Sequence, residues 1–271
     1  MQITLPRLFG AATLAGAVLI AGCGNGDDAA EVRSIKVGTM SGPESEVMEV
    51  AVQIARERYD LEVEIIEFTD YVSPNAALAD GSLDANAFQH EPYLQSMIND
   101  RGYDLAVAGY TFVYPIGAYS ERYDSIEELP EEALIALPND PTNGGRAMIL
   151  MHNAGLIELD DPENLEATPV NVIDNPNNFS FREIEAAQLP RVLADVDLAF
   201  INNTFAQPAG LHLDDALIKE GPESPYVNLI AVRADDVERE EIQQLVSAYQ
   251  SDEVAEKALE LFDGGAVPGW K

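Results

Sequence analysis

Hydrophobic and polar positions alternate and cluster along the chain in a way that predicts strands and helices in turn. Residues 61–68 alternate apolar and acidic side chains, which is typical of a strand with one buried face. Residues 44–58 carry apolar side chains at helical spacing, and the apolar run 35–40 before them predicts another strand. A strand, a helix and a strand of these lengths predict a βαβ unit in a parallel sheet.

The pattern continues to the end of the chain. Further strands are predicted to end near Phe88 and to lie at 103–113, 115–120, 133–138, 170–173, 181–184, 196–201 and 225–232. Further helices are predicted at 74–80, from about 92 to 101, at 124–129, from about 146 through 152, from 187, after 202–204, at 238–250 and at 252–262. This order predicts an α/β fold.

The course of the chain predicts two lobes. It leaves the first α/β group near Pro115, builds a second group, and returns with the strand at 225–232. We therefore expect lobe 1 to comprise residues 34–114 plus 228–271 and lobe 2 to comprise residues 115–227. Two lobes joined in this way predict a ligand cleft between them.

The N-terminus has the pattern of an export signal. Arg7 precedes a short apolar run, and small residues lead directly into Cys23, the only cysteine. The run predicts that residues 1–22 are a secretory signal, too short for a comfortable transmembrane span. The end of the run resembles a bacterial lipobox, in which Cys23 is acylated; the alternative is an ordinary signal peptide with an incidental thiol. Residues 23–33 then predict a flexible tether, so we expect a lipid anchor at the membrane.

Charge narrows the function classes. The 271 residues carry a formal net charge of −33, spread along a chain that is 46% hydrophobic. Such a chain can bury a core but lacks the basic stripe that nucleic acid requires, so we expect no nucleic-acid partner. Because salt screens self-repulsion, the charge suggests a halophile-like acidic surface that works in a salty compartment. The alternative is simply an acidic secreted protein.

One short stretch concentrates candidate binding residues. Phe88, His90 and Tyr93 lie within six positions, where a strand is predicted to end and a helix to begin near Pro92. Tyr71 follows the preceding predicted strand, and the carboxyl ends of such strands meet at the ligand crevice of α/β folds. The alternatives are core aromatics at 88 and 93, a satisfied histidine at 90, and a surface-loop tyrosine at 71.

Two later stretches supply polar groups. Residues 139–146 predict a loop that opens into a helix, with Arg146 in its first turn. Free amides at a helix N-terminus and an arginine fork both suit a carboxylate, although an exposed helix arginine is the alternative. Asn202 follows a predicted strand, where capping the next helix is its simplest role and does not exclude ligand contact.

Several motifs together resemble a known family. DANAFQHEPYL is followed in order by TFVYPIGAYS, LPNDPTNGGR, INNTFA, ESPYVNLI and YQSDEV, and then by the ending GGAVPGW. The chain resembles the methionine-binding lipoproteins of bacterial ABC transporters, the MetQ or NlpA family, from Ile35 to Trp270. Asn203-Thr204-Phe205 differs from a Thr-Thr-Tyr variant of the family.

The resemblance implies a two-lobed periplasmic-binding-protein fold of type 2, with hinge closure over a ligand. It implies a methionine side chain held by Tyr71, Phe88, His90 and Tyr93, because a thioether favours aromatic neighbours. Asn143 and Arg146 match the carboxylate group, and Asn202 and Asn228 match polar residues around the two charged ends. It further implies a lipid-anchored protein that faces the periplasm and delivers methionine to a membrane permease and its ATPase.

Other classes of protein fit less well. The sequence has no GxSxG, no HExxH, no phosphate-binding GxxxxGK[ST] and no cysteine besides Cys23, so we expect neither an enzyme nor a nucleotide site. Three scattered histidines give no basis for a metal or another cofactor. The alternative that the sequence excludes least is the same fold binding another apolar amino acid or a short peptide.

Overall fold

The computed structural model describes residues 33–221 and 223–271. The predicted signal peptide 1–22 and Cys23 lie outside the described residues, as does the predicted tether except for Arg33. The strands are β1 (Arg33–Met40), β2 (Leu61–Phe68), β3 (Ala85–His90), β4 (Leu105–Val113), β5 (Ile116–Tyr119), β6 (Leu134–Pro138), β7 (Glu158–Leu159), β8 (Val172–Asp174), β9 (Ser180–Ile184), β10 (Leu198–Asn202), β11 (Ile218–Lys219), β12 (Val227–Arg233) and β13 (Val267–Pro268).

Eight α-helices lie between these strands in the described residues. They are α1 (Pro43–Tyr59), α2 (Ser73–Ala79), α3 (Glu91–Arg101), α4 (Pro141–Asn153), α5 (Leu189–Val192), α6 (Asn203–Ala206), α7 (Glu240–Tyr249) and α8 (Asp252–Leu261). Short 3-10 turns lie at Ile126–Glu128, Pro169–Asn171, Ala186–Gln188, Leu193–Asp195, Gln207–Ala209, Leu213–Asp215 and Ala234–Asp236. The α/β fold predicted from the sequence is confirmed.

A six-stranded sheet has the order β13-β4-β12-β3-β1-β2. β1 pairs with β2 and β3 in parallel, which confirms the predicted βαβ unit around α1. β12 lies between β3 and β4 and runs antiparallel to both. The hydrophobic pattern predicted this returning strand but not its direction, because a strand buried on both faces shows the same pattern in either orientation.

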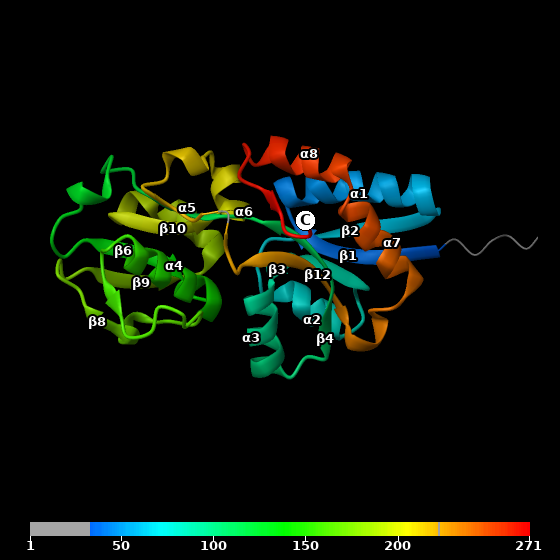
Figure 1. The fold of residues 1–271 in the computed structure, drawn as a ribbon, viewed down its shortest axis with the longest axis horizontal. Coiled ribbons are helices and arrows are strands. Elements are labelled where there is room, and N and C mark those ends of the chain that lie inside the picture. The colour runs from blue at the N-terminus through cyan, green and yellow to red at the C-terminus, as the bar shows by residue number, and fades with distance from the viewer. Residues whose placement is uncertain (1–32, 222) are drawn as a thin grey trace, which may run out of the picture. The chain divides into compact units, whose positions relative to one another are not determined.

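Helices cover both faces of this sheet (Figure 1). α1, α7 and α8 pack on one face, where Val47, Ile242 and Val254 join the largest buried cluster. α2 and α3 pack on the other face, where Leu78 and Leu94 are fully buried. Because both faces are covered, β3 is buried along its whole length.

The second sheet has five strands in the order β11-β5-β10-β6-β9. β6 pairs in parallel with β9 and β10, whereas β5 runs antiparallel to β10 and β11. α4 packs on one face through Ala147, Met148 and Met151, and α5 packs on the other through Leu189. The strand predicted at 170–173 is half right: Val172 and Ile173 lie in β8, but Pro169 opens a 3-10 turn that takes the two residues before them.

The chain passes between the two sheets twice. Tyr114 and Pro115 connect β4 in the first sheet with β5 in the second. Residues 220–226 connect β11 in the second sheet with β12 in the first. The carboxyl ends of β3 and β10 both lie near these connections, and they carry the residues of the site described below.

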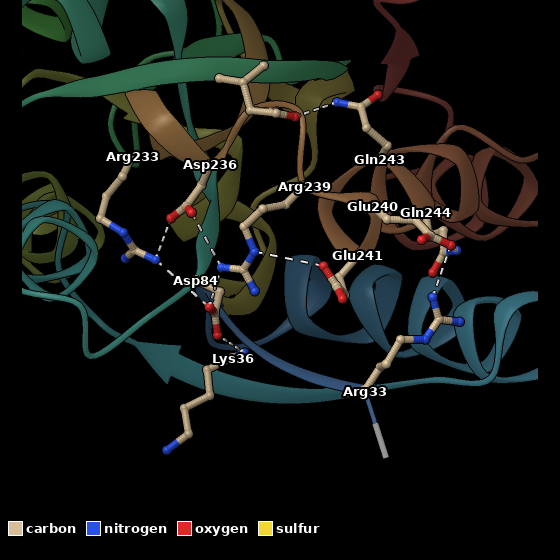
Figure 2. Close-up of polar contacts among 11 residues, drawn as sticks. Arg33, Lys36, Asp84, Arg233, Asp236, Arg239, Glu240, Glu241, Gln243 and Gln244 are labelled. Atoms are coloured by element: carbon tan, nitrogen blue, oxygen red, sulfur yellow. Dashed lines mark hydrogen bonds and ion pairs between the residues drawn. The ribbon is translucent and has the colours of Figure 1, made fainter. Parts of the chain in front are cut away.

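A network of ion pairs joins segments of the six-stranded sheet (Figure 2). Arg239 donates to Asp84 at 2.9 Å, and Arg233 pairs with Asp236 at 2.6 Å. Arg233 also donates to the carbonyl oxygens of Leu78 and Leu83. The network therefore ties the loop before β3 to the chain that follows β12.

Candidate functional site

A pocket between the two sheets brings all eight predicted binding residues together. The space between its side chains, part of it open to solvent, measures about 340 Å³. Its wall consists of Tyr71, Phe88, Gln89, His90, Tyr93, Tyr114, Asn143, Arg146, Asn202, Asn203, Thr204 and Asn228. Among these described wall residues, Arg146 is the only one with a permanent charge.

One side of the pocket is aromatic. The rings of Tyr71, Phe88 and Tyr93 lie 5.9–6.2 Å apart, and Phe205 from α6 packs on Tyr71 at 5.0 Å. The Tyr93 hydroxyl donates to the Tyr71 carbonyl oxygen at 2.8 Å, which holds the Tyr71 loop against α3. Tyr71 is thus half-buried in the wall and not a free surface tyrosine. Such a wall suits an apolar or polarizable ligand group.

His90 has two roles that fix its protonation. Its Nδ1 accepts a hydrogen bond from the Tyr93 amide at 3.1 Å and so caps α3, while its Nε2 contacts Asn143 Oδ1 at 3.2 Å. The neutral tautomer with the proton on Nε2 satisfies both contacts. Burial, followed by the nearby Arg146 charge, lowers the pKa of His90 to about 3. His90 therefore links the two sheets as a neutral donor.

Asn143 is held by partners from both sheets. Its Nδ2 donates to Asp140, and its Oδ1 accepts from Asn202 Nδ2 at 2.7 Å as well as from His90. Asn202 stands at the N-cap of α6, but its side chain makes no capping bond. Its buried Oδ1 has no partner among the described residues. An unpaired buried acceptor in a pocket wall is a natural partner for a ligand ammonium group.

Arg146 lies in the pocket wall but one turn later in its helix than the sequence predicted. α4 begins at Pro141, so Arg146 is in its second turn, and Asp140 caps the first turn by accepting from the Asn143 amide at 2.9 Å. Gly144 and Gly145 lie inside the helix. A Cβ on Gly145 would stand 2.2 Å from the Leu165 carbonyl oxygen. Gly145 therefore allows the backbone at Leu165 to pack closely against α4. Because Asp140 already caps the first turn, the start of the helix is not open to an anion.

The Arg146 side chain is buried and paired. Its Nε donates to Glu220 Oε1 at 2.9 Å, its Nη2 donates to Glu220 Oε2, and its Nη2 also donates to the Tyr114 carbonyl oxygen at 3.0 Å. The guanidinium carbon stands 4.5 Å from the centre of the Tyr226 ring. The alternative of an exposed helix arginine is therefore wrong, because only 2% of Arg146 is accessible.

Sequence reasoning missed several residues at the site. Gln89, Tyr114, Asn203 and Thr204 line the pocket beside the predicted residues. Asn203 and Thr204 directly follow Asn202 at the end of β10, so the position of that strand end was the available signal. Glu220 gave no such signal, because one acid among many is uninformative in so acidic a chain.

Glu44 lies behind the pocket wall. It is 2% exposed in the first turn of α1 and accepts a hydrogen bond from the Thr204 hydroxyl at 2.5 Å. Burial raises the pKa of the Glu44 carboxyl to about 8, although the Thr204 hydroxyl lowers it. Like the contact between His90 and Asn143, this bond joins elements of the two sheets.

Comparison with known proteins gives the family. Residues 35–270 match the family model described as NlpA lipoprotein. The chain belongs to the NlpA lipoprotein family. It is 48% identical over 271 residues to a probable D-methionine-binding lipoprotein MetQ of Vibrio cholerae, covering 100% of both chains. It is also 48% identical over 260 residues to the D-methionine-binding lipoprotein MetQ of Escherichia coli, covering 95% of both chains.

Solved structures show the same fold. A crystal structure of the methionine-binding protein MetQ is 49% identical, with a TM-score of 0.86, and the match covers 88% of this chain and 98% of that one. A nutrient-binding protein from Burkholderia cenocepacia bound to methionine is 47% identical, with a TM-score of 0.85, covering 87% and 99%. These relatives are binding proteins and not enzymes, and they confirm the fold of the periplasmic-binding-protein class predicted for this chain.

Within residues 33–221 and 223–271, no group of three or more His, Cys, Asp or Glu side chains is arranged to hold a metal ion. No helix in the same residues is long and apolar enough to cross a membrane.

Proposed function

We propose that this chain is the substrate-binding lipoprotein of a bacterial ABC importer and that it captures methionine. One observation carries the proposal: an aromatic wall and a buried arginine face the same pocket between two sheets. A zwitterion needs a cation for its carboxylate, acceptors for its ammonium and, for a thioether, an apolar neighbour. The methionine found in the Burkholderia cenocepacia relative supports this ligand.

The proposed ligand pose assigns each predicted residue a part. The thioether lies against Tyr71, Phe88, His90 and Tyr93, and the carboxylate meets Arg146. Asn143, Asn202 and Asn228 surround the two charged ends, with the unpaired Asn202 Oδ1 suited to the ammonium. Asn143 acts chiefly by holding Asn202 and His90 in place, because both ends of its side-chain amide already have protein partners.

We further propose that the two sheets with their helices move as two lobes, residues 34–114 plus 228–271 and residues 115–227. The hydrogen bonds Thr204 to Glu44 and His90 to Asn143 join opposite lobes and support a closed arrangement. Opening at Tyr114–Pro115 and at 220–226 would break these contacts and admit the ligand. Methionine then stabilises the closed form in proportion to its higher affinity for that form.

The cellular setting follows from the family and the N-terminus. We propose that residues 1–22 are removed, that Cys23 is acylated, and that residues 23–33 tether the protein to the cell membrane facing the periplasm. The closed protein delivers methionine to a permease that a cytoplasmic ATPase drives. Mass spectrometry of membrane-extracted protein should find a lipid on Cys23, and Cys23→Ser should release the protein from the membrane fraction.

The acidic composition leads us to propose adaptation to salt. A net charge of −33 repels itself at low ionic strength, and salt screens that repulsion. The melting temperature should therefore rise from low salt to molar KCl. A melting temperature that stays constant or falls over that range would contradict the proposal.

The decisive experiment is a calorimetric titration with L-methionine. Protein without residues 1–23 is unfolded and refolded in high KCl to remove any bound ligand, and its fold is checked by circular dichroism. We expect tight one-to-one binding. No heat from folded protein would contradict methionine as the ligand and favour another apolar amino acid or a short peptide, which a panel of such ligands would identify.

Two variants test the pose. Arg146→Ala should weaken binding by about a hundredfold or more, because a buried charge-assisted contact is lost. Tyr93→Ala should weaken methionine binding more than it lowers the melting temperature. If affinity and melting temperature fell together for Tyr93→Ala, the ring would be a core residue and no part of the binding wall.

A further inference from the structure

The guanidinium group of Arg146 faces two spaces. Arg146 lines the ligand pocket, and it also lines a second hollow that is bounded by Glu220, Ser224 and Tyr226. Glu220 is absent from the wall of the ligand pocket. Glu220 therefore approaches the guanidinium from the side away from the ligand.

The contacts of Arg146 leave the Nη1 group of its guanidinium available for a ligand. Nε and Nη2 donate to Glu220, and Nη2 also donates to the Tyr114 carbonyl oxygen. Within the described part of the chain, Nη1 makes no hydrogen bond. Because a two-bonded arginine–carboxylate pair fixes the plane and the direction of the guanidinium, the Glu220 pair determines where Nη1 points.

Glu220 is itself held in place. Its Oε1 accepts a hydrogen bond from the Ser224 hydroxyl at 3.0 Å, and its backbone amide donates to the Ile116 carbonyl oxygen at 3.1 Å. Both side chains of the pair are almost fully buried, with 3% of Arg146 and 8% of Glu220 exposed. A carboxylate held in this way orients its partner more strictly than an exposed one does.

From this geometry we propose that Glu220 is a positioning residue for ligand recognition: it turns the Arg146 fork so that Nη1 meets the ligand carboxylate. The proposal rests on the proposed function, since it assumes an amino-acid ligand in this pocket. The groups that contact the Arg146 guanidinium lie in both connections between the sheets. Tyr114 belongs to one connection, and Glu220 and Tyr226 belong to the other. Recognition of the carboxylate is thereby tied to the segments about which the lobes would turn.

Two other roles for Glu220 predict different effects of its removal on ligand binding. If Glu220 served only to neutralise Arg146, its removal would strengthen the attraction between the free guanidinium and a ligand carboxylate. If it served only the fold, its removal would weaken all ligands alike. Positioning alone predicts a loss that is specific to ligands with a carboxylate.

The test compares L-methionine with L-methioninol, in which a hydroxymethyl group replaces the carboxylate. The ratio of their dissociation constants is measured by calorimetry on the whole protein, for wild type, Glu220→Ala and Glu220→Gln. Glu223→Gln is the matched control, because it removes an exposed acid three residues further along. We expect the preference for methionine to fall by about tenfold or more in Glu220→Ala. In Glu220→Gln, which keeps an acceptor for Nε, the preference should lie between those of wild type and Glu220→Ala. The control variant should match wild type.

An unchanged or larger preference in Glu220→Ala would overturn the proposal. If the alanine variant does not fold, the glutamine variant decides by the same ratio. A second measurement needs no ligand: the Arg146 Nε–H signal in NMR should exchange slowly with water in wild type and fast in Glu220→Ala, and equal rates would also overturn the proposal. Failure of wild type to bind methionine would refute the proposed function alone, and the ratio is then measured with the amino acid that binds and its alcohol.

Discussion

Two glutamates are buried between the sheets, and they are neutralised in different ways. Glu220 meets the guanidinium of Arg146, so charge compensates charge. Among the residues that the structure describes, Glu44 accepts a side-chain hydrogen bond only from the Thr204 hydroxyl, and the rings of Tyr71, Tyr114 and Tyr249 are titratable groups nearby. Burial raises the pKa of Glu44 to about 8. A buried acid thus either keeps its charge beside a cation or gives it up by binding a proton.

The difference separates two kinds of control over one pocket. The Glu220 pair fixes the direction of the Arg146 guanidinium. Glu44 joins elements of the two sheets by accepting a hydrogen bond from the Thr204 hydroxyl, and burial favours the protonated form of its carboxyl. The first is suited to ligand recognition and the second to a pH-dependent balance between open and closed forms.

Removing one partner of the ion pair should have the largest effect. Glu220→Ala leaves the buried Arg146 charge with a carbonyl and a ring, and breaking such a pair costs about 3–5 kcal/mol of unfolding free energy. Denaturant unfolding at pH 7 measures the loss. Replacing both partners, as Arg146→Met with Glu220→Leu, should restore most of it because no charge remains buried. A loss below about 1 kcal/mol for the single variant would show that the pair is effectively solvated.

The second expected effect is a pH dependence of methionine binding. The closed state holds the Glu44 proton up to about pH 8, whereas a solvated carboxyl has the ordinary pKa of 4.5. The closed state therefore binds more protons than the open state between these values, so closure and affinity weaken as pH rises. The limit is about tenfold per pH unit. The same sign applies to unfolding: stability from this group is present below pH 4.5 and is lost as pH rises towards 8.

The pKa of His90 is shifted in the direction opposite to that of Glu44, and this shift sets the pH range in which binding should be measured. Its pKa is lowered from 6.5 to about 3, so it costs stability only as pH falls below 6.5. Dissociation constants measured from pH 6.5 to 8 therefore report on Glu44. Glu44→Gln should abolish the slope, and Glu46→Gln, an exposed acid on the same helix, should keep it. A wild-type affinity that stays constant over this window would contradict the proton-linked closure.

The smallest expected effect concerns the ion network of Figure 2. Arg239 and Asp84 form a 2.9 Å pair, but their side chains are 33% and 26% exposed. Exposed pairs contribute up to about 1 kcal/mol and lose strength in salt. The stability difference between wild type and Arg239→Ala should be small at low salt and smaller in molar KCl. A difference above about 2 kcal/mol, or one that grows with salt, would show that this network stabilises the fold as a buried ion pair such as Arg146–Glu220 does.

Much of the fold was predictable from the sequence. The alternation at 61–68 and the helical spacing at 44–58 lie within β2 and α1 almost to the residue. Strand ends predicted near Phe88 and at 196–201 located two walls of the pocket, because ligand-facing residues follow strand ends in α/β folds. Residues 133–138 and 225–232 likewise correspond to β6 and β12.

Other features followed only from the tertiary structure. Periodicity reports which face of an element is buried, but it does not report what lies opposite that face. Nothing near Glu220 in the sequence indicates Arg146, which is 74 residues away. The same holds for Thr204 and Glu44, which are 160 residues apart.

The sequence by itself determined the elements, the family and the eight pocket residues that the fold brings together. Tertiary structure decided which of their polar atoms are already paired, that His90 is neutral, and that α4 is capped by its own Asp140. The physical reason is that burial and long-range pairing set the energy of a charge. Both depend on the surroundings that the folded chain creates, and not on the residues beside the charge in the sequence.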